Sequence, residues 1–378
     1  MTVNYVGLAL VLNCGSSSVK YQVVDTTQDA PLASGLIERV THHGEAIRAI
    51  IDALSQPGSG VDLDRLTVVG HRVVQGGAEF SAPTIIDDDV ERSIALLATL
   101  APLHNPPNLA GISAARAAFP DLPHVAIFDT AFHSTLSEAA HTYAIDHRVA
   151  QEHGVRRYGF HGTSHSYVSR ETARLMDRPV EELSMIVLHL GNGASACAVQ
   201  GGRSVDTSMG LTPLEGLVMG TRSGDIDPAV TLHLARTAGM TIDEVDALLN
   251  RQSGMLGLTG YSDMRDVRTA ADDGSREALL GLEVYCRRIR GYVGQYFAQL
   301  GKLDAIAFTA GVGENDDDVR LESLSGLEAL GIVMDAERNK GRKKQATLVS
   351  ADDSPVQVWV VPTNEEREIA LQSIAAVS

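Results

Sequence analysis

Residues 8–25 read LALVLNCGSSSVKYQVVD, and this stretch decides the fold class. Its first part is a short apolar run closed by turn residues, which is typical of a buried strand, and apolar alternation resumes from Val19. Between them the sequence predicts a β-hairpin that grips phosphate. Gly15 permits a tight return whose backbone N–H groups can point at an anion, three serine hydroxyls donate, and Lys20 adds positive charge. Asn13 offers a neutral oxygen near an accompanying metal ion. A serine-rich turn without a ligand is the alternative.

A second segment, residues 185–199, repeats this pattern as MIVLHLGNGASACAV. Gly191, Gly193 and Ala196 also match the dinucleotide fingerprint, but that fingerprint requires a helix where this sequence alternates like a strand. The Rossmann interpretation is therefore rejected. The phosphate-loop string of P-loop enzymes and the motif set of protein kinases are both missing from the sequence. Two phosphate hairpins in one chain indicate two related lobes.

Composition limits the function classes. A chain of 378 residues that is 44% hydrophobic is long enough for two α/β cores. Its net charge of −17 argues against nucleic acid or an anionic membrane as a partner, so small anions must be met by local arginines. Three cysteines without paired spacing imply neither a disulfide framework nor a zinc site, which fits a reducing cytoplasm. No run reaches eighteen apolar residues, so we expect no membrane span.

The remaining elements are expected from periodicity and from turn residues. Asp129 should stand at the carboxyl end of its strand, where open α/β sheets place ligands. The expected strands are 66–69, 124–129, 305–308 and 356–361. The expected helices are 87–119 with a break at 101–108, a helix opened by 158–165, helices within 226–250, a long helix over 275–300 and a terminal helix after Pro362.

Phosphoryl transfer needs positioning and neutralisation of charge. Arg72 and Arg222 each follow an apolar segment in a glycine-bearing loop, so each guanidinium could reach the oxygens of a transferring group. The alternative for each is a surface salt bridge. His161 could donate to the same oxygens or be a buried structural histidine. Asp129 and Glu365 could hold hydrated Mg²⁺.

Taken together, these motifs resemble the acetate kinase family over nearly the whole chain. They are the Asn13–Lys20 hairpin, His71–Val74, Leu103–Pro106, Phe128–His133, Gly159–His165, His189–Gly193, Gly220–Arg222, Gly311–Asn315 and Pro362–Glu366. The resemblance implies an α/β, two-lobed, actin-like ATPase fold with duplicated ββαβα-type (ribonuclease H-like) cores and a cleft between the lobes. It places the acyl and phosphate side in residues 1–150 together with the terminal helix 365–378, and nucleotide binding and dimerisation in residues 151–364.

The resemblance also implies roles for single residues. Arg72 would bind the substrate carboxylate or phosphate, His161 and Arg222 would stabilise the transition state, and Asp129 matches the residue described as proton donor or acceptor. Because a carboxylate substrate is already ionised at pH 7, a role for Asp129 in orienting Arg72 or a metal-bound water is favoured. The other implied sets are Val74, Leu103, Phe160 and Pro213 for the acyl group; Lys20, His189, Leu190, Gly191, Asn192, Gly193, Asp263, Met264, Arg265, Gly311, Val312, Gly313, Glu314 and Asn315 for ATP; and Asn13 and Glu365 for the metal.

Three departures from the family pattern are visible. Gln75 stands where a histidine is common, Met264 replaces a common phenylalanine, and the region after Asp25 is short.

The expected function is reversible, Mg²⁺-dependent transfer of the ATP γ-phosphoryl group to acetate, giving acetyl phosphate and ADP, with Mn²⁺ as an alternative metal. We expect a cytoplasmic homodimer with no nucleic-acid or membrane partner. A propionate or butyrate kinase is the nearest alternative, since one methylene changes discrimination by only about 1–3 kcal/mol. A chaperone-like ATPase is the alternative from another class, although a water nucleophile would need no carboxylate-binding arginine.

Overall fold

The computed structural model describes residues 6–378. Contacts divide the chain into two compact units, each of which is described by itself. Unit 1 holds the residues up to Ser134, Phe160–Tyr167 and Asn364–Ser378, and unit 2 holds Thr135–Gly159 and Val168–Thr363. The chain therefore leaves unit 1 before the expected boundary at residue 150 and returns to it briefly at 160–167.

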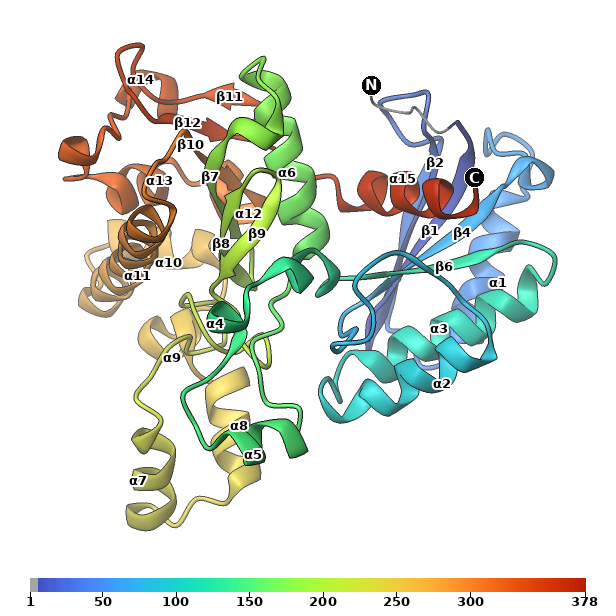
Figure 1. Cartoon of the computed structure of the whole chain (residues 1–378), viewed down its shortest axis with the longest axis horizontal. Coiled ribbons are helices and arrows are strands. Elements are labelled where there is room, and N and C mark those ends of the chain that lie inside the picture. The colour runs from blue at the N-terminus through green and yellow to red at the C-terminus, as the bar shows by residue number, and fades with distance from the viewer. Residues whose placement is uncertain (1–5) are drawn as a thin grey trace. The chain divides into compact units, whose positions relative to one another are not determined.

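A six-stranded mixed sheet is the centre of unit 1 (Figure 1). Its order is β3-β2-β1-β4-β6-β5, where β1 pairs with β4 and β4 with β6 in parallel, and the other pairs are antiparallel. The strands are β1 (Leu8–Cys14), β2 (Ser18–Asp25), β3 (Ala33–Glu38), β4 (Val68–Val73), β5 (Thr84–Ile85) and β6 (His124–Phe128).

Unit 2 repeats this sheet. Its order, β9-β8-β7-β10-β12-β11, has the same sequence of antiparallel and parallel neighbours, including a short antiparallel strand at the far edge. The strands are β7 (Ser184–Leu190), β8 (Ala194–Gln200), β9 (Arg203–Thr207), β10 (Ala305–Thr309), β11 (Thr347–Leu348) and β12 (Gln357–Val360). The duplicated core expected from the two hairpins is confirmed, and β7–β8 is a hairpin as the rejection of the Rossmann interpretation required.

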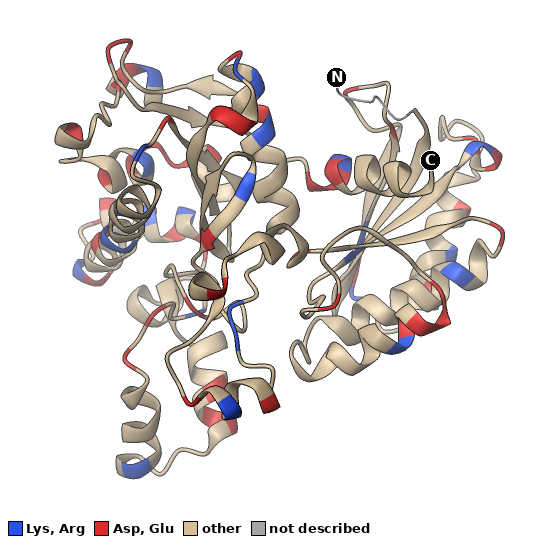
Figure 2. Cartoon of the chain, in the orientation of Figure 1, with Lys and Arg blue, Asp and Glu red and all other residues tan. Residues whose placement is uncertain are grey.

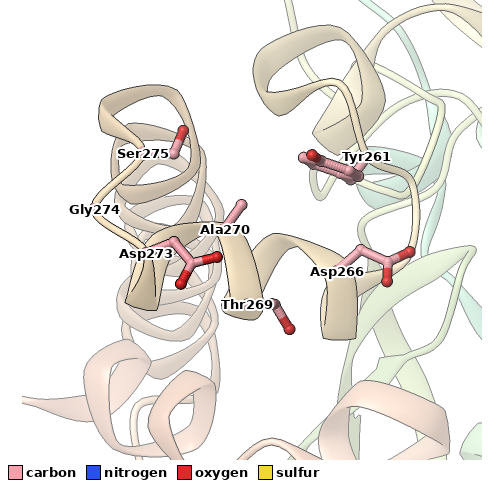
Figure 3. Close-up of a pocket in the computed structure, with 7 residues that line it drawn as sticks. All are labelled: Tyr261, Asp266, Thr269, Ala270, Asp273, Gly274 and Ser275. Atoms are coloured by element: carbon pink, nitrogen blue, oxygen red, sulfur yellow. The ribbon is translucent and has the colours of Figure 1, made fainter.

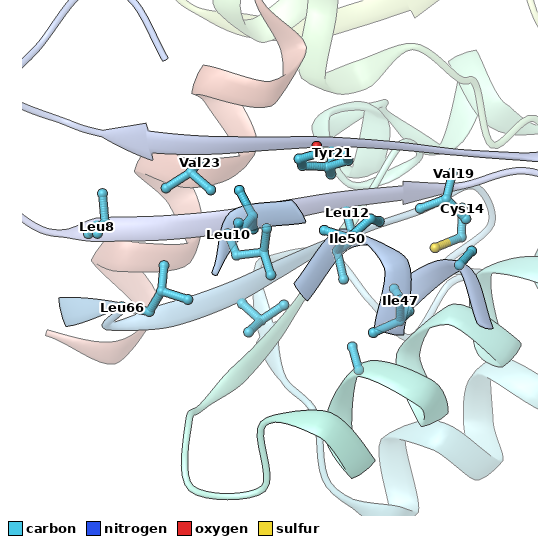
Figure 4. Close-up of a cluster of buried hydrophobic side chains, with 14 residues drawn as sticks. Leu8, Leu10, Leu12, Cys14, Val19, Tyr21, Val23, Ile47, Ile50 and Leu66 are labelled. Atoms are coloured by element: carbon cyan, nitrogen blue, oxygen red, sulfur yellow. The ribbon is translucent and has the colours of Figure 1, made fainter. Parts of the chain in front are cut away.

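Helices cover both faces of the first sheet. Leu10, Leu12 and Val69 pack with Ile47 and Ile50 of α1 (His43–Leu54) in the cluster drawn in Figure 4. On the other face α15 (Glu365–Val377) packs on β1, β4 and β6. The remaining helices are α2 (Asp88–Leu96), α3 (Asn105–Ala118), α4 (Glu138–His141), α5 (His147–Glu152), α6 (Gly162–Leu175), α7 (Ala229–Thr237), α8 (Ile242–Arg251), α9 (Gly254–Thr259), α10 (Met264–Asp272), α11 (Arg276–Leu300), α12 (Ala310–Asn315), α13 (Asp317–Leu324) and α14 (Ala336–Asn339).

The expectation that Arg72 lies in a loop is wrong, because β4 runs to Val73 instead of ending at Val69. Gly70 suggested a break, yet it serves a close approach: a Cβ there would lie 2.5 Å from the Ser373 hydroxyl of α15. The long helix expected over 275–300 is confirmed by α11. Within residues 6–378 no helix combines the length and the apolar character needed to cross a membrane.

Candidate functional site

In unit 1 the candidate residues gather on one face of the sheet. Because side chains alternate along a strand, residues two apart share a face. Val68, Val125 and Val11 pack against α15. Residues two or four positions further along the same strands therefore lie on the face of the sheet that α15 covers. These positions are Arg72 in β4, Asn13 in β1 and Asp129, which directly follows β6 and accepts a hydrogen bond from Arg72. Glu365 begins α15 on the same side.

Arg72 and Asp129 form a two-point ion pair. Arg72 Nε donates to Oδ1 of Asp129 at 2.9 Å, and Nη2 donates to Oδ2 at 2.7 Å. Glu365 Oε2 lies 4.0 Å from Arg72 Nε. Burial opposes the charge of the guanidinium, but the carboxylates of Asp129 and Glu365 outweigh it and raise the pKa of Arg72. Asp129 is 1% exposed, and both of its oxygens are committed to Arg72.

The hairpin between β1 and β2 is present, with one difference from expectation. The N–H of Gly15 donates to the Ser18 carbonyl at 2.8 Å and closes the turn, so it does not point at an anion. Lys20 is half-exposed, and its ammonium lies 2.5 Å from Glu366 of α15. The side chains of residues 16–18 and Lys20 remain donors that a phosphate at this turn could use.

The segment Phe160–Gly162 is held at the end of β6. The N–H of Gly162 donates to the Asp129 carbonyl at 2.9 Å, and a Cβ on Gly162 would lie 2.3 Å from that oxygen, so only glycine fits. His161 adopts φ 58°, a left-handed conformation that costs a non-glycine residue about 1–3 kcal/mol. Strained residues of this kind cluster at functional sites.

The expected acyl-pocket residues differ in burial. Phe160 is 1% exposed, while Leu103 is 50% exposed, and Val74 and Pro213 are partly buried. Val74 lies two residues after Arg72, directly beyond the end of β4. In unit 1 it is therefore the stronger candidate for contact with a substrate methyl group.

Unit 2 contains a cavity of about 920 Å³. Eight of the expected ATP residues line it, namely Gly191, Asn192, Asp263, Met264, Arg265, Gly311, Val312 and Asn315. His189 and Leu190 are instead buried in β7, and Gly193, Gly313 and Glu314 do not line the cavity. The cavity is within the size range of small-molecule sites.

Glu314 supports the loop and does not face the cavity. Its Oε1 accepts the backbone N–H groups of Ala310 at 2.9 Å and of Thr363 at 3.2 Å. Burial raises the pKa of Glu314, and these two donors oppose that rise. Ala310 has φ 66°, so the carboxylate stabilises a strained turn from β10 into α12.

Helix α10 separates this cavity from a second hollow. One face of α10 carries Arg265, Arg268 and Asp272, which line the large cavity. Another face carries Asp266 and Thr269, which line the second hollow. Figure 3 shows the second hollow, about 470 Å³, between α10, Tyr261 and the start of α11. None of the expected ATP residues lines it. Acidic and basic residues are interspersed around α10 and α11 (Figure 2). At the large cavity Arg268 forms a two-point pair with Asp316.

Sequence reasoning missed several lining residues of the large cavity. Arg342 belongs to the basic run 340–344, a pattern that is typical of solvated surface. Tyr285 lines the cavity from α11, and its buried hydroxyl has no hydrogen-bond partner among residues 6–378. Nothing in a helical pattern distinguishes such a residue from ordinary core.

The guanidinium of Arg222 contacts only uncharged groups within residues 6–378. Its Nη1 donates to the Pro213 carbonyl at 3.2 Å, and no acidic partner is recorded for it within residues 6–378. Burial lowers the pKa of Arg222. A partly buried guanidinium without a counterion favours the binding of an anion.

Comparison with known proteins shows which family the chain belongs to. The model of the acetokinase family matches residues 8–45 and 39–371. The chain belongs to the acetokinase family. It is thus a phosphotransferase with a carboxylate acceptor, as the resemblance implied.

Relatives agree over nearly the full length. The acetate kinase of Leifsonia xyli subsp. xyli is 59% identical over 391 residues, with 98% of each chain covered, and that of Streptomyces avermitilis is 54% identical, with 97% of each covered. The crystal structure of Porphyromonas gingivalis acetate kinase matches with TM-score 0.95 at 38% identity, covering 98% of this chain and 100% of that one. A propionate kinase from Francisella tularensis matches with TM-score 0.91 at 38% identity, covering 97% and 99%.

Proposed function

We propose that the protein transfers the γ-phosphoryl group of ATP to acetate, reversibly, giving acetyl phosphate and ADP. A carboxylate oxygen of acetate forms the new bond to phosphorus, and the bond between phosphorus and the β–γ bridging oxygen breaks, leaving with ADP. No proton has to move, because acetate is already ionised at neutral pH. The observation that carries the proposal is Arg72, whose guanidinium Asp129 holds at two points.

This arrangement supports one role for each residue in unit 1. Arg72 would bind the carboxylate or its phosphorylated product, and Val74, with Leu103 and Phe160, would contact the methyl group. Asp129 would fix the guanidinium, since both carboxylate oxygens already accept hydrogen bonds from it. An orienting role for Asp129 is therefore favoured over a role as general base.

Unit 2 would bind the nucleotide. Gly191, Asn192, Asp263, Met264, Arg265, Gly311, Val312 and Asn315 would surround ATP in the 920 Å³ cavity. Arg222 would stabilise negative charge on the transferring group, because its guanidinium is largely buried and has no acidic partner within residues 6–378. His161 would donate to the same charge, and Lys20 would contact ATP phosphates.

Asn13 and Glu365 have the chemistry of magnesium ligands. Mg²⁺ prefers hard oxygen ligands, usually takes only one or two carboxylates and keeps several waters. The amide of Asn13 and the partly exposed carboxylate of Glu365 fit that description, although no cluster of three acidic, histidine or cysteine ligands occurs within residues 6–378. Bound Mg²⁺ would neutralise phosphate charge. Glu365→Ala should raise the Mg²⁺ concentration needed for half-maximal activity, and an unchanged magnesium titration would move this role elsewhere.

A homodimer formed through unit 2 is supported by one helix. Helix α7 has no buried residue, and Ile226, Val230 and Leu232 in or before it are exposed. Isolated helices of this length are marginal in water, so packing against a second copy would stabilise it. The cytoplasm is the proposed compartment because the three cysteines are unpaired.

The decisive experiment traps acyl phosphate with hydroxylamine. Purified protein with ATP, Mg²⁺ and acetate should give acetate-dependent hydroxamate, with ADP formed in equal amount. ADP release that is independent of any carboxylate would instead support the ATPase alternative. Propionate and butyrate run in parallel decide the acyl preference, which the Francisella propionate kinase makes a real alternative.

A further inference from the structure

Two buried amides project from the start of α3 toward the end of β4. Asn105 is 1% exposed and Asn108 is 4% exposed. A buried amide requires partners for both its oxygen and its nitrogen, because a buried polar group that loses its water without gaining a partner is destabilising. The partners that the two asparagines use are different, and this difference separates their roles.

Asn108 bridges two strands. Its Oδ1 accepts the backbone N–H of Val74 at 3.1 Å, and its Nδ2 donates to the carbonyl of Cys14 at 2.7 Å. The assignment of oxygen and nitrogen is fixed, since Val74 N–H can only donate and the Cys14 carbonyl can only accept. Asn105, by contrast, makes both of its short hydrogen bonds to one residue: it accepts from Gln75 N at 3.1 Å and donates to Gln75 O at 3.0 Å.

The two strand ends joined by Asn108 are the ones that the proposed function uses. Cys14 directly follows Asn13 at the start of the phosphate hairpin, and Val74 follows Arg72 at the acyl-binding end of β4. Although β1 and β4 pair in parallel, their register ends at Leu12 and His71. Beyond that pair no backbone hydrogen bond of the sheet joins the two segments. The side-chain amide of Asn108 connects them instead.

Gly111 allows α3 to lie close enough to β1 for the Asn108 amide to reach the Cys14 carbonyl. It lies one turn after Asn108 in α3, and a Cβ at this position would lie 2.2 Å from the sulfur of Cys14, which is itself buried. Any larger residue would push α3 away from Cys14 and lengthen the hydrogen bond of Asn108. A close approach of helix to strand is therefore built into the sequence at the place where the amide needs it.

We propose that Asn108 is a positioning residue that sets the spacing between the phosphate hairpin and the carboxylate-binding end of β4. It acts through the backbone of Cys14 and Val74 and touches no reactant. The proposal rests on the proposed function, because it assumes that the two strand ends bind the two substrates of one reaction. An amide is required, since no apolar side chain or ionised carboxylate of this size both donates and accepts.

Asn108→Ala and Asn105→Ala form a matched pair for the test. Losing a net hydrogen bond of about 1 kcal/mol corresponds to roughly fivefold, so Asn108→Ala should raise KM for both acetate and MgATP by about three- to tenfold. Asn105→Ala should change KM for acetate and leave KM for MgATP within about twofold. Assays well below the unfolding midpoint of each variant separate this pattern from a plain loss of stability.

Two further variants keep the test decisive where the alanine variant does not fold. Asn108→Asp places an ionised carboxylate against the Cys14 carbonyl, but its protonated form can again donate there and accept from Val74. Its activity relative to the unchanged protein should therefore rise as pH falls. Gly111→Ala retains the amide and should reproduce the paired KM effects. A flat activity ratio between pH 5 and 8 would overturn the role of the amide.

Amide hydrogen exchange gives a readout that needs no activity. Asn108→Ala should speed exchange in peptides covering residues 72–77 and 13–20, whereas Asn105→Ala should affect only the first. Protection unchanged at 13–20 would overturn the proposal even in an active enzyme. Absence of acetate-dependent hydroxamate from the unchanged protein would refute the proposed function instead, so the two failures are distinguishable.

Discussion

The Arg72–Asp129 pair makes a quantitative prediction about how Asp129 works. Each of the two charge-assisted hydrogen bonds, at 2.9 and 2.7 Å, contributes about 1.5–3 kcal/mol when a charged partner is removed. They orient the guanidinium for a two-point contact of comparable strength with the substrate carboxylate, about 3–6 kcal/mol, so Arg72→Ala should lower kcat/KM for acetate by about two to four orders of magnitude. Asp129→Ala should lower it by a similar or smaller factor, because the guanidinium remains but loses its fixed orientation.

The double variant distinguishes the two interpretations of Asp129. If Asp129 acts only through Arg72, the double variant should match Arg72→Ala to within about twofold, since groups acting as a unit are non-additive. The assay is hydroxamate formation over a range of acetate at fixed MgATP. A double variant that loses the product of the two single factors would refute the orienting role and favour an independent one, such as general base.

Three further predictions test other parts of the account. Val74→Ala should raise the kcat/KM ratio of propionate to acetate by roughly fourfold, from about 0.8 kcal/mol per methylene; an unchanged ratio in an active variant would remove Val74 from the acyl pocket. Arg222→Ala should lower kcat by about 10²–10³ with KM for MgATP nearly constant, and the reverse pattern would contradict a role in the transition state. Nε2 of His71 lies 2.9 Å from Nδ1 of His124 in the core. Burial lowers the pKa of both histidines, and the charge of His124 lowers the pKa of His71 further. The unfolded histidines then bind more protons near pH 6, so the unfolding midpoint should fall as pH drops below about 6.5, and His124→Gln should flatten that slope.

The sequence was sufficient for the fold because its main features are local. Each hairpin is marked by an apolar run, a small polar turn and resumed alternation, and Asp87 caps α2 by accepting from Val90 N as its position predicts. Gly70 was misinterpreted, since one sequence cannot tell a glycine that ends a strand from one that lets α15 approach. That distinction depends on Ser373, about 300 residues away.

The candidate sites divide along the same line. Arg72 and Asp129 could each be predicted near the end of a strand, but alternation within one strand cannot show that residues of two strands share a face. The buried position of Leu190 and the contact of Glu314 with the backbone N–H of Ala310, however, depend on tertiary packing, which a short glycine-rich motif does not encode. Asn108 was visible only as part of a helix-opening motif, because its two partners come from strands that the sequence cannot pair in register.

Isotope transfer tests the central claim, that a carboxylate oxygen of acetate forms the new bond to phosphorus. The measurement is ³¹P NMR of the product formed from ATP and acetate carrying ¹⁸O in both oxygens. The account predicts acetyl phosphate in which every phosphorus is bonded to one ¹⁸O bridge, formed in equal amount with ADP and lost in Arg72→Ala. Acetyl phosphate without ¹⁸O bonded to phosphorus, or inorganic phosphate released without acetate, would contradict it.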